Sequence, residues 1–150
     1  MTAAPPGNAS HAAEPNPPRS AAAEPLPYDL VGGEKGLRNL VETFYDIIER
    51  EPEGRVLHVL HLRGHGVAHS RIEQFNFLSG FFAGPSLYVQ EHGHSDVRQM
   101  HEHVEIDAGA KDAWLNCMSI AIDRVGLPAD IKARLMAPFA RVATLLVNQK

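Results

Sequence analysis

Residues 107–125 read DAGAKDAWLNCMSIAIDRV, and this stretch decides the fold class. Its apolar side chains return at the three- and four-residue spacing of one helix face: Ala110, Trp114, Cys117, Met118, Ala121 and Val125. Asp107 precedes the stripe as an N-cap, because its carboxylate can accept hydrogen bonds from the free amides of the first turn. Gly126-Leu127-Pro128 closes it. The stretch therefore predicts one long amphipathic helix.

The same spacing recurs in three other segments and predicts helices near 36–50, 67–83 and 129–147. Pro52 and the Gly84-Pro85 pair end the first two, since proline lacks an amide hydrogen and clashes with the preceding turn. Pro138 lies inside the last one and is expected to kink it or split it into two packed pieces. No segment alternates as a strand would. The sequence therefore predicts an all-α fold.

Composition narrows the function classes. The 150 residues suit one domain, and a formal charge of −4 leaves no basic excess for binding nucleic acid. No apolar run approaches the roughly 20 residues of a membrane span. A single cysteine, Cys117, excludes an internal disulfide and a four-cysteine zinc site. We expect a cytoplasmic protein with no nucleic-acid and no membrane partner.

Residues 1–27 differ in composition from the rest. They hold seven of the eleven prolines and eight alanines, but no aromatic residue. Such a segment cannot bury enough surface to offset the entropy of ordering it. It also lacks the apolar run of a signal peptide. We expect residues 1–27 to be a disordered tail and residues 28–150 to be the single domain.

Histidines are the unusual feature: the chain has nine, and eight fall between His58 and His103. Four side chains would form a zinc or nickel stripe on an unbroken helix: His61, His65, His69 and Glu73. Gly64 and Gly66, however, favour a turn there, which would break the stripe. Solvated loop histidines are the alternative for this segment.

The irregular segment 86–106 carries four further histidines. A histidine on a short helix that faces an apolar cavity suits an axial haem ligand, because neutral imidazole binds iron from one side of the macrocycle. A surface or helix-capping histidine is the alternative for each of them. Spacing alone does not decide between the two.

A set of short strings, in order and at compatible spacing, is more specific. They are VGGE at 31–34, FY at 44–45, FLSG at 77–80, GP at 84–85, LY at 87–88, HGH at 92–94, Arg98 with His101, and DAWLNCM at 112–118. Together they resemble the truncated haemoglobins of the second group. The WLxCM string thirteen residues after His101 is the most telling element.

This resemblance implies a truncated globin fold, a two-over-two helical sandwich around one haem b, in which the four long helices form two antiparallel pairs. Residues 28–150 would be the haem-binding domain. His101 falls on the family's proximal histidine and would ligate the iron, with His103 left at the rim. Met100 and the run EHVE at 102–105 depart from the family pattern, which puts a propionate contact and the course of this segment in doubt.

The resemblance also assigns the positions around the haem: Tyr45, His61, Ser70, Gln74, Phe77, Arg98 and Trp114. Tyr45, Gln74 and Trp114 would donate hydrogen bonds to bound dioxygen, which carries partial negative charge. Arg98 would pair with a propionate. From the residues alone, Tyr45 and Trp114 are equally compatible with core aromatics, and Arg98 with a surface salt bridge.

The expected function is a haem-binding globin that binds dioxygen or another diatomic ligand such as NO or CO. Peroxidase or NO-detoxifying chemistry would need an external electron donor, so enzyme status stays open, as does homo-oligomer formation. Two alternatives remain: a histidine-rich zinc- or nickel-binding helical protein, and a haem-free interaction or sensory module on a globin scaffold.

Overall fold

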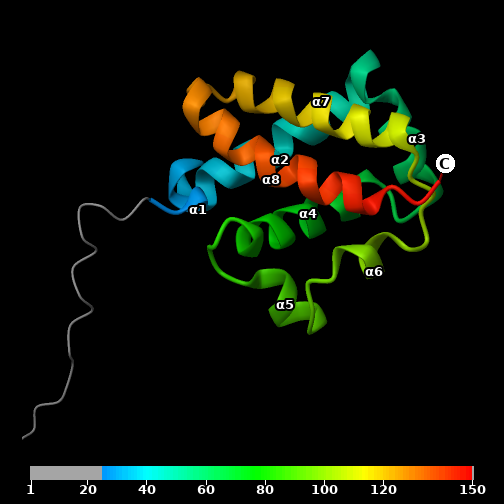
Figure 1. The fold of residues 1–150 in the computed structure, drawn as a ribbon, viewed down its shortest axis with the longest axis horizontal. Coiled ribbons are helices and arrows are strands. Elements are labelled where there is room, and N and C mark those ends of the chain that lie inside the picture. Colours follow the sequence, from blue (N-terminus) through cyan, green and yellow to red (C-terminus); the bar gives the residue numbers. More distant parts are fainter. Residues whose placement is uncertain (1–24, 150) are drawn as a thin grey trace, which may run out of the picture.

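Four long helices form where the apolar periodicity predicts them. They are α2 (Gly33–Arg50), α4 (Val67–Phe81), α7 (Ala108–Arg124) and α8 (Ala129–Leu146), seen in a computed structural model that describes residues 25–149 (Figure 1). Within this range the chain contains no β-strand, and the prediction of an all-α fold is confirmed.

Five shorter elements were not predicted. They are α1 (Pro27–Leu30), the 3-10 helix η1 (Pro52–Gly54), α3 (Arg55–Arg63), α5 (Leu87–His92) and α6 (Val97–His101). Each has nine residues or fewer, too short for a clear apolar period. Two of them follow recognisable start signals, because Pro52 opens η1 and Asp96 caps α6 by accepting from the amides of Arg98 and Gln99.

Of the expected tail, residues 1–27, the first 24 residues lie outside the described range. The last three of its residues are described. Leu26 is extended, and Pro27 is the first residue of α1.

The helix ends agree with the capping signals. Asp107 accepts a hydrogen bond from the amide of Ala110 at 2.8 Å, as expected of an N-cap. Pro138 does not split the last helix, since α8 runs as one element from Ala129 to Leu146. Of the two expected outcomes this excludes the split, and the packing of Leu135 and Phe139 against the core holds the helix together on both sides of the proline.

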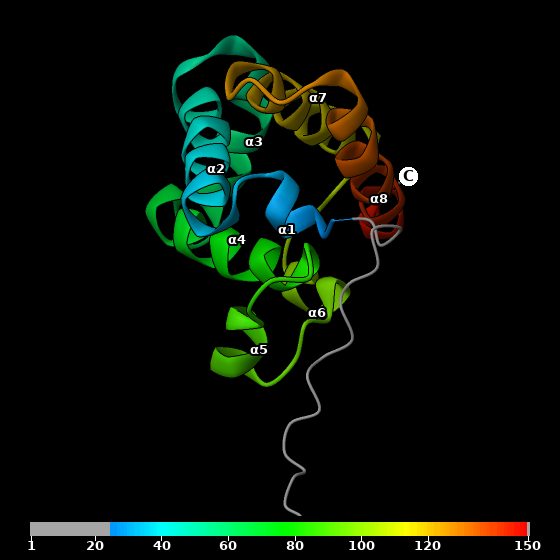
Figure 2. The ribbon, with the colours of Figure 1, turned by 90° about the vertical axis from the view of Figure 1, so that its left-hand side faces the viewer.

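The long helices form two pairs. Figure 2 shows α2 with α4 on one side and α7 with α8 on the other, the latter two joined by the short turn at 125–128. The predicted face of α2 lies in the core, which is why the pairs stay together: Leu37, Leu40, Val41, Phe44 and Ile48 are all 1% exposed or less. The four helices thus form the two-over-two sandwich that the resemblance implies, and α5 and α6 lie below it in Figure 1.

A cluster of charges joins α2 to α4 near the interior. The guanidinium of Arg71 lies 3.1 Å from Glu42 Oε1, 2.9 Å from Asp46 Oδ1 and 2.5 Å from Glu49 Oε1. Burial alone would lower the pKa of Arg71, but the hydrogen bonds that it donates to Glu49, Asp46 and Glu42 outweigh burial and raise that pKa. One cation on α4 thus bridges three carboxylates on α2 and offsets one of their three negative charges.

Replacing Arg71 with methionine is expected to lower the free energy of unfolding by about 1–2 kcal/mol, because three carboxylates then repel one another without a partner. Thermal unfolding followed by circular dichroism measures this. Arg141→Met is the control, since Arg141 is exposed on α8 and has no ion-pair partner among residues 25–149. Equal melting temperatures for the two variants would contradict the expectation.

No helix in the described range is long and apolar enough to cross a membrane.

Candidate functional site

A cavity of about 450 Å³ opens between the two helix pairs, bounded by side chains from α2 through α8. Its walls are mainly apolar: Leu57, Leu60, Phe77, Leu78, Phe81, Phe139, Val142 and Leu146. Polar side chains, six histidines among them, face the same space. This size and this mixture are typical of cavities that hold a small molecule or a cofactor.

Seven of the eight residues assigned to haem or iron line this one cavity: Tyr45, His61, Ser70, Gln74, Phe77, His101 and Trp114. They come from α2, α3, α4, α6 and α7, so the fold gathers residues that are up to 69 positions apart, from 45 to 114. Arg98 is exposed on α6 and is not part of the lining. Two residues that depart from the family pattern near His101, Met100 and His103, do line the cavity.

His101 is the last residue of α6 and faces the cavity with its ring partly buried. Its Nδ1 lies 2.8 Å from the carbonyl oxygen of Val97, one turn earlier, so the ring donates its hydrogen there. Burial lowers the pKa of His101, the bond to Val97 acts in the opposite sense, and the neighbouring His103 lowers it a little further. The imidazole is therefore held neutral, and its Nε2 has no hydrogen-bond partner among the described residues.

His61 is on α3 and lines the same cavity. Its Nδ1 lies 2.7 Å from the carbonyl oxygen of Leu57, and its ring meets that of Tyr45 edge to face at 5.5 Å. Burial is the main cause that lowers the pKa of His61, and the neighbouring His101 and His58 lower it as well. His61 is thus a second neutral imidazole at the cavity wall.

Tyr45 and Gln74 form the polar part of the wall on the α2–α4 pair. The hydroxyl of Tyr45 donates to Gln74 Oε1 over 3.4 Å, a long bond that leaves the hydrogen available to a better acceptor. Burial raises the pKa of Tyr45, with Arg71 and Ser70 acting in the opposite sense, so the phenol stays protonated. The pair offers a hydrogen-bond donor that is already positioned.

Trp114 lies on α7 with its ring between Phe44, at 5.2 Å, and Phe139, at 5.0 Å. Both neighbours are buried, so the indole cannot rotate freely. Within residues 25–149 no acceptor is bonded to its Nε1–H, which therefore remains free to donate into the cavity.

The sequence did not predict the apolar part of the wall that α8 and α3 supply. Phe139 stacks on Phe81 at 5.5 Å and closes the cavity from the α8 side. Leu57 and Leu60 come from α3, whose apolar pairs at 56–57 and 59–60 were the available signal. The apolar stripe of α8 was predicted, but periodicity does not tell a core face from a cavity face.

The segment after His101 is tied to the end of the chain. Asn148 Nδ2 donates to the carbonyl of Val104 at 2.9 Å, and Asn148 Oδ1 accepts from the amide of Ile106 at 2.8 Å. The amides of Asn148 and Gln149 both reach the carbonyl of Ile106. These bonds give the EHVE departure a defined course.

The alternative zinc or nickel stripe of His61, His65, His69 and Glu73 is not assembled. Residues Gly64 to Gly66 separate α3 from α4, as the two glycines indicated, and His61 turns into the cavity. His65 and His69 have ring centroids 5.1 Å apart, and His65 lies 5.8 Å from His103. Within residues 25–149, the ligand atoms of the four stripe residues do not form one group within 4.8 Å of one another.

Comparison with known proteins agrees with this geometry. The family model described as bacterial-like globin matches residues 27–148. A curated relative, the group 2 truncated hemoglobin YjbI of Bacillus subtilis, is 35% identical over 123 residues, which cover 82% of this chain and 89% of that protein.

Solved structures are similar as well. The group II 2-on-2 hemoglobin of Agrobacterium tumefaciens superposes with a TM-score of 0.79 at 28% identity, covering 87% of this chain and 99% of that one. The truncated oxygen-avid haemoglobin of Bacillus subtilis gives 0.73 at 34% identity, with coverage of 83% and 100%. A cold-adapted truncated hemoglobin from Pseudoalteromonas haloplanktis gives 0.78 at 31%, with coverage of 84% and 100%.

Proposed function

Since the chain belongs to the bacterial-like globin family, as a group II truncated haemoglobin, and that family binds haem, we propose that its cavity holds haem b with His101 as the iron ligand. We further propose that the bound haem takes dioxygen or another diatomic gas on the side of Tyr45, Gln74 and Trp114. Bound haem supplies a ferrous iron to which such gases attach.

The observation that carries this proposal is the state of His101. A histidine that ligates a metal through one ring nitrogen donates the hydrogen of the other to a carbonyl or carboxylate. His101 has this arrangement already, with Nδ1–H on Val97 and Nε2 free at the cavity. His61 has the same bond to Leu57, but its ring packs against Tyr45. We therefore assign iron to His101 and the opposite side to His61.

The residues on that opposite side favour retention of a polar ligand. The Tyr45 hydroxyl and the Trp114 indole each carry a hydrogen that no strong acceptor holds. Ser70 and Gln74 add a hydroxyl and an amide at the same wall. The similarity to a haemoglobin described as oxygen-avid supports dioxygen as the ligand.

The propionates of haem would require cations or donors. Lys111 on α7, with His69 on α4, lines the cavity and can supply them. Arg98 stays a prediction for this role, because its side chain is exposed outside the lining. Redox turnover of NO or peroxide at this site would draw electrons from a separate donor. We also propose a cytoplasmic location, because the free, buried thiol of Cys117 suits a reducing compartment.

The single tryptophan of the chain provides a direct test, because it lines the proposed site. Titrating the full haem-free chain with hemin is expected to quench the fluorescence of Trp114 in proportion to added hemin, with a sharp end point at one hemin per chain. Quenching that rises gradually without an end point would contradict a specific site.

A further inference from the structure

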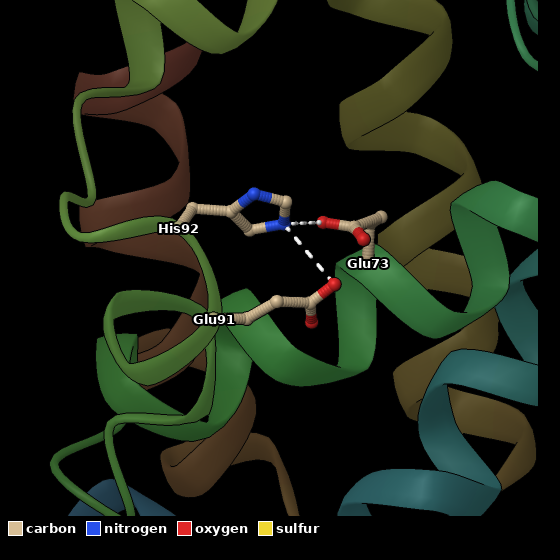
Figure 3. A group of neighbouring side chains, drawn as sticks. All are labelled: Glu73, Glu91 and His92. Carbon is tan, nitrogen blue, oxygen red and sulfur yellow. Dashed lines mark hydrogen bonds and ion pairs between the residues drawn. The ribbon is translucent and has the colours of Figure 1, made fainter.

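Two glutamates and a histidine meet beside the cavity, where α5 lies against α4 (Figure 3). His92 Nε2 is 2.8 Å from Glu73 Oε2 and 3.6 Å from Glu91 Oε1. One ligand atom from each residue lies within 4.8 Å of the other two, and no other trio of His, Cys, Asp or Glu in residues 25–149 does so. Glu73 and His92 also line the cavity.

An ion pair between α4 and α5 accounts for only part of this group. The His92 ring faces both carboxylates, and a single imidazole carries at most one positive charge against their two negative charges. Placing two carboxylates around one imidazole is costly unless a further positive charge joins them.

The neighbouring side chains orient the three ligands. Asn76 Nδ2 donates to Glu91 Oε2 at 3.3 Å, so the other oxygen stays turned toward His92. The ring of Tyr88 packs on that of His92 with centroids 4.3 Å apart. Such supporting contacts around the ligands are typical of metal sites.

We propose that Glu73, Glu91 and His92 form a binding site for a divalent zinc ion. Imidazole nitrogen and carboxylate oxygen are both zinc ligands, and two carboxylates balance its charge. Three protein ligands leave a fourth position for water. His69 Nε2, which lies 4.0 Å from Glu73 Oε1, is a second imidazole next to the site. The proposal does not depend on haem, because none of the three residues is assigned to it.

The test is a titration of the full chain with Zn²⁺ alone, after treatment with a chelator, in competition with a colorimetric zinc indicator. We expect one equivalent of Zn²⁺ per chain and a rise in melting temperature on binding. Excess Mg²⁺ should neither displace the zinc nor raise the melting temperature, since Mg²⁺ prefers oxygen ligands.

The double variant Glu73→Gln/His92→Gln is expected to lose at least about tenfold in zinc affinity, together with the thermal shift. The matched control is Glu102→Gln/His94→Gln, which removes one carboxylate and one imidazole of the same surface outside the group, and it should bind as the unaltered chain does. Glu91→Gln alters an exposed side chain only and keeps the test valid if the double variant misfolds.

Two results would overturn the proposal. One is that the unaltered chain fails to take Zn²⁺ from the colorimetric indicator. The other is equal zinc affinity in the unaltered chain and the Glu73→Gln/His92→Gln variant, which would move binding to the other histidines, such as His65 and His103. Hemin quenching of Trp114, measured on the same samples, separates a failure here from a failure of the haem proposal.

Discussion

Replacing His101 with alanine is expected to remove the protein ligand of the haem iron and to change the absorption spectrum of the haem-loaded chain completely. The reason is that His101 alone presents a neutral ring to the cavity with its Nδ1 engaged and no aromatic ring against it. The measurement is the ferrous spectrum of the purified variant beside that of the unaltered chain. An unchanged spectrum would refute the assignment.

The neighbouring histidine supplies the control. His103 also lines the cavity and is two residues away, so His103→Ala alters the same segment without touching the assigned ligand. It should keep the spectrum. A further check is His101→Gly with imidazole added to the buffer, because free imidazole can replace the missing ring. Recovery of the original spectrum by imidazole would separate lost ligation from lost folding.

Removing the donors on the opposite side is expected to speed the escape of dioxygen. A hydrogen bond to a charged or strongly polarised acceptor contributes about 1.5–3 kcal/mol, so Tyr45→Phe and Trp114→Phe should each raise the dissociation rate by about tenfold or more. Stopped-flow displacement of dioxygen by carbon monoxide measures this rate.

Tyr28→Phe is the matched control for the first of these variants, because Tyr28 lies in α1 outside the cavity lining. Its dissociation rate should equal that of the unaltered chain. If Tyr45→Phe and Trp114→Phe both kept the original rate as well, the donor account of the cavity would be wrong.

The sequence carried enough information for the four long helices because each has a continuous apolar face. The face of α2 from Leu37 to Ile48 is buried as its spacing predicts, and Asp107 caps α7. The short helices were not predicted because tertiary contacts stabilise them, and they have no apolar periodicity of their own. α3 buries only Leu57, and α5 and α6 bury no residue completely.

The site was predictable to a different degree on its two sides. The spacing of the histidines did not identify an iron ligand, and the resemblance assigned His101 only by its position relative to the family strings. The structure adds what no string contains, namely the bond from His101 to Val97 and the long bond from Tyr45 to Gln74. The meeting of Glu73 with His92 depends on how α5 folds back on α4, which the sequence pattern does not specify.

The central claim is that the cavity binds haem through a histidine and leaves the other side open to gases. The absorption spectrum of the full chain, purified with haem supplied, tests this most directly when recorded oxidised, reduced with dithionite and then exposed to carbon monoxide. The account predicts a strong Soret band that shifts on reduction and again with carbon monoxide. A chain that shows no Soret band, even after hemin is added, would contradict it.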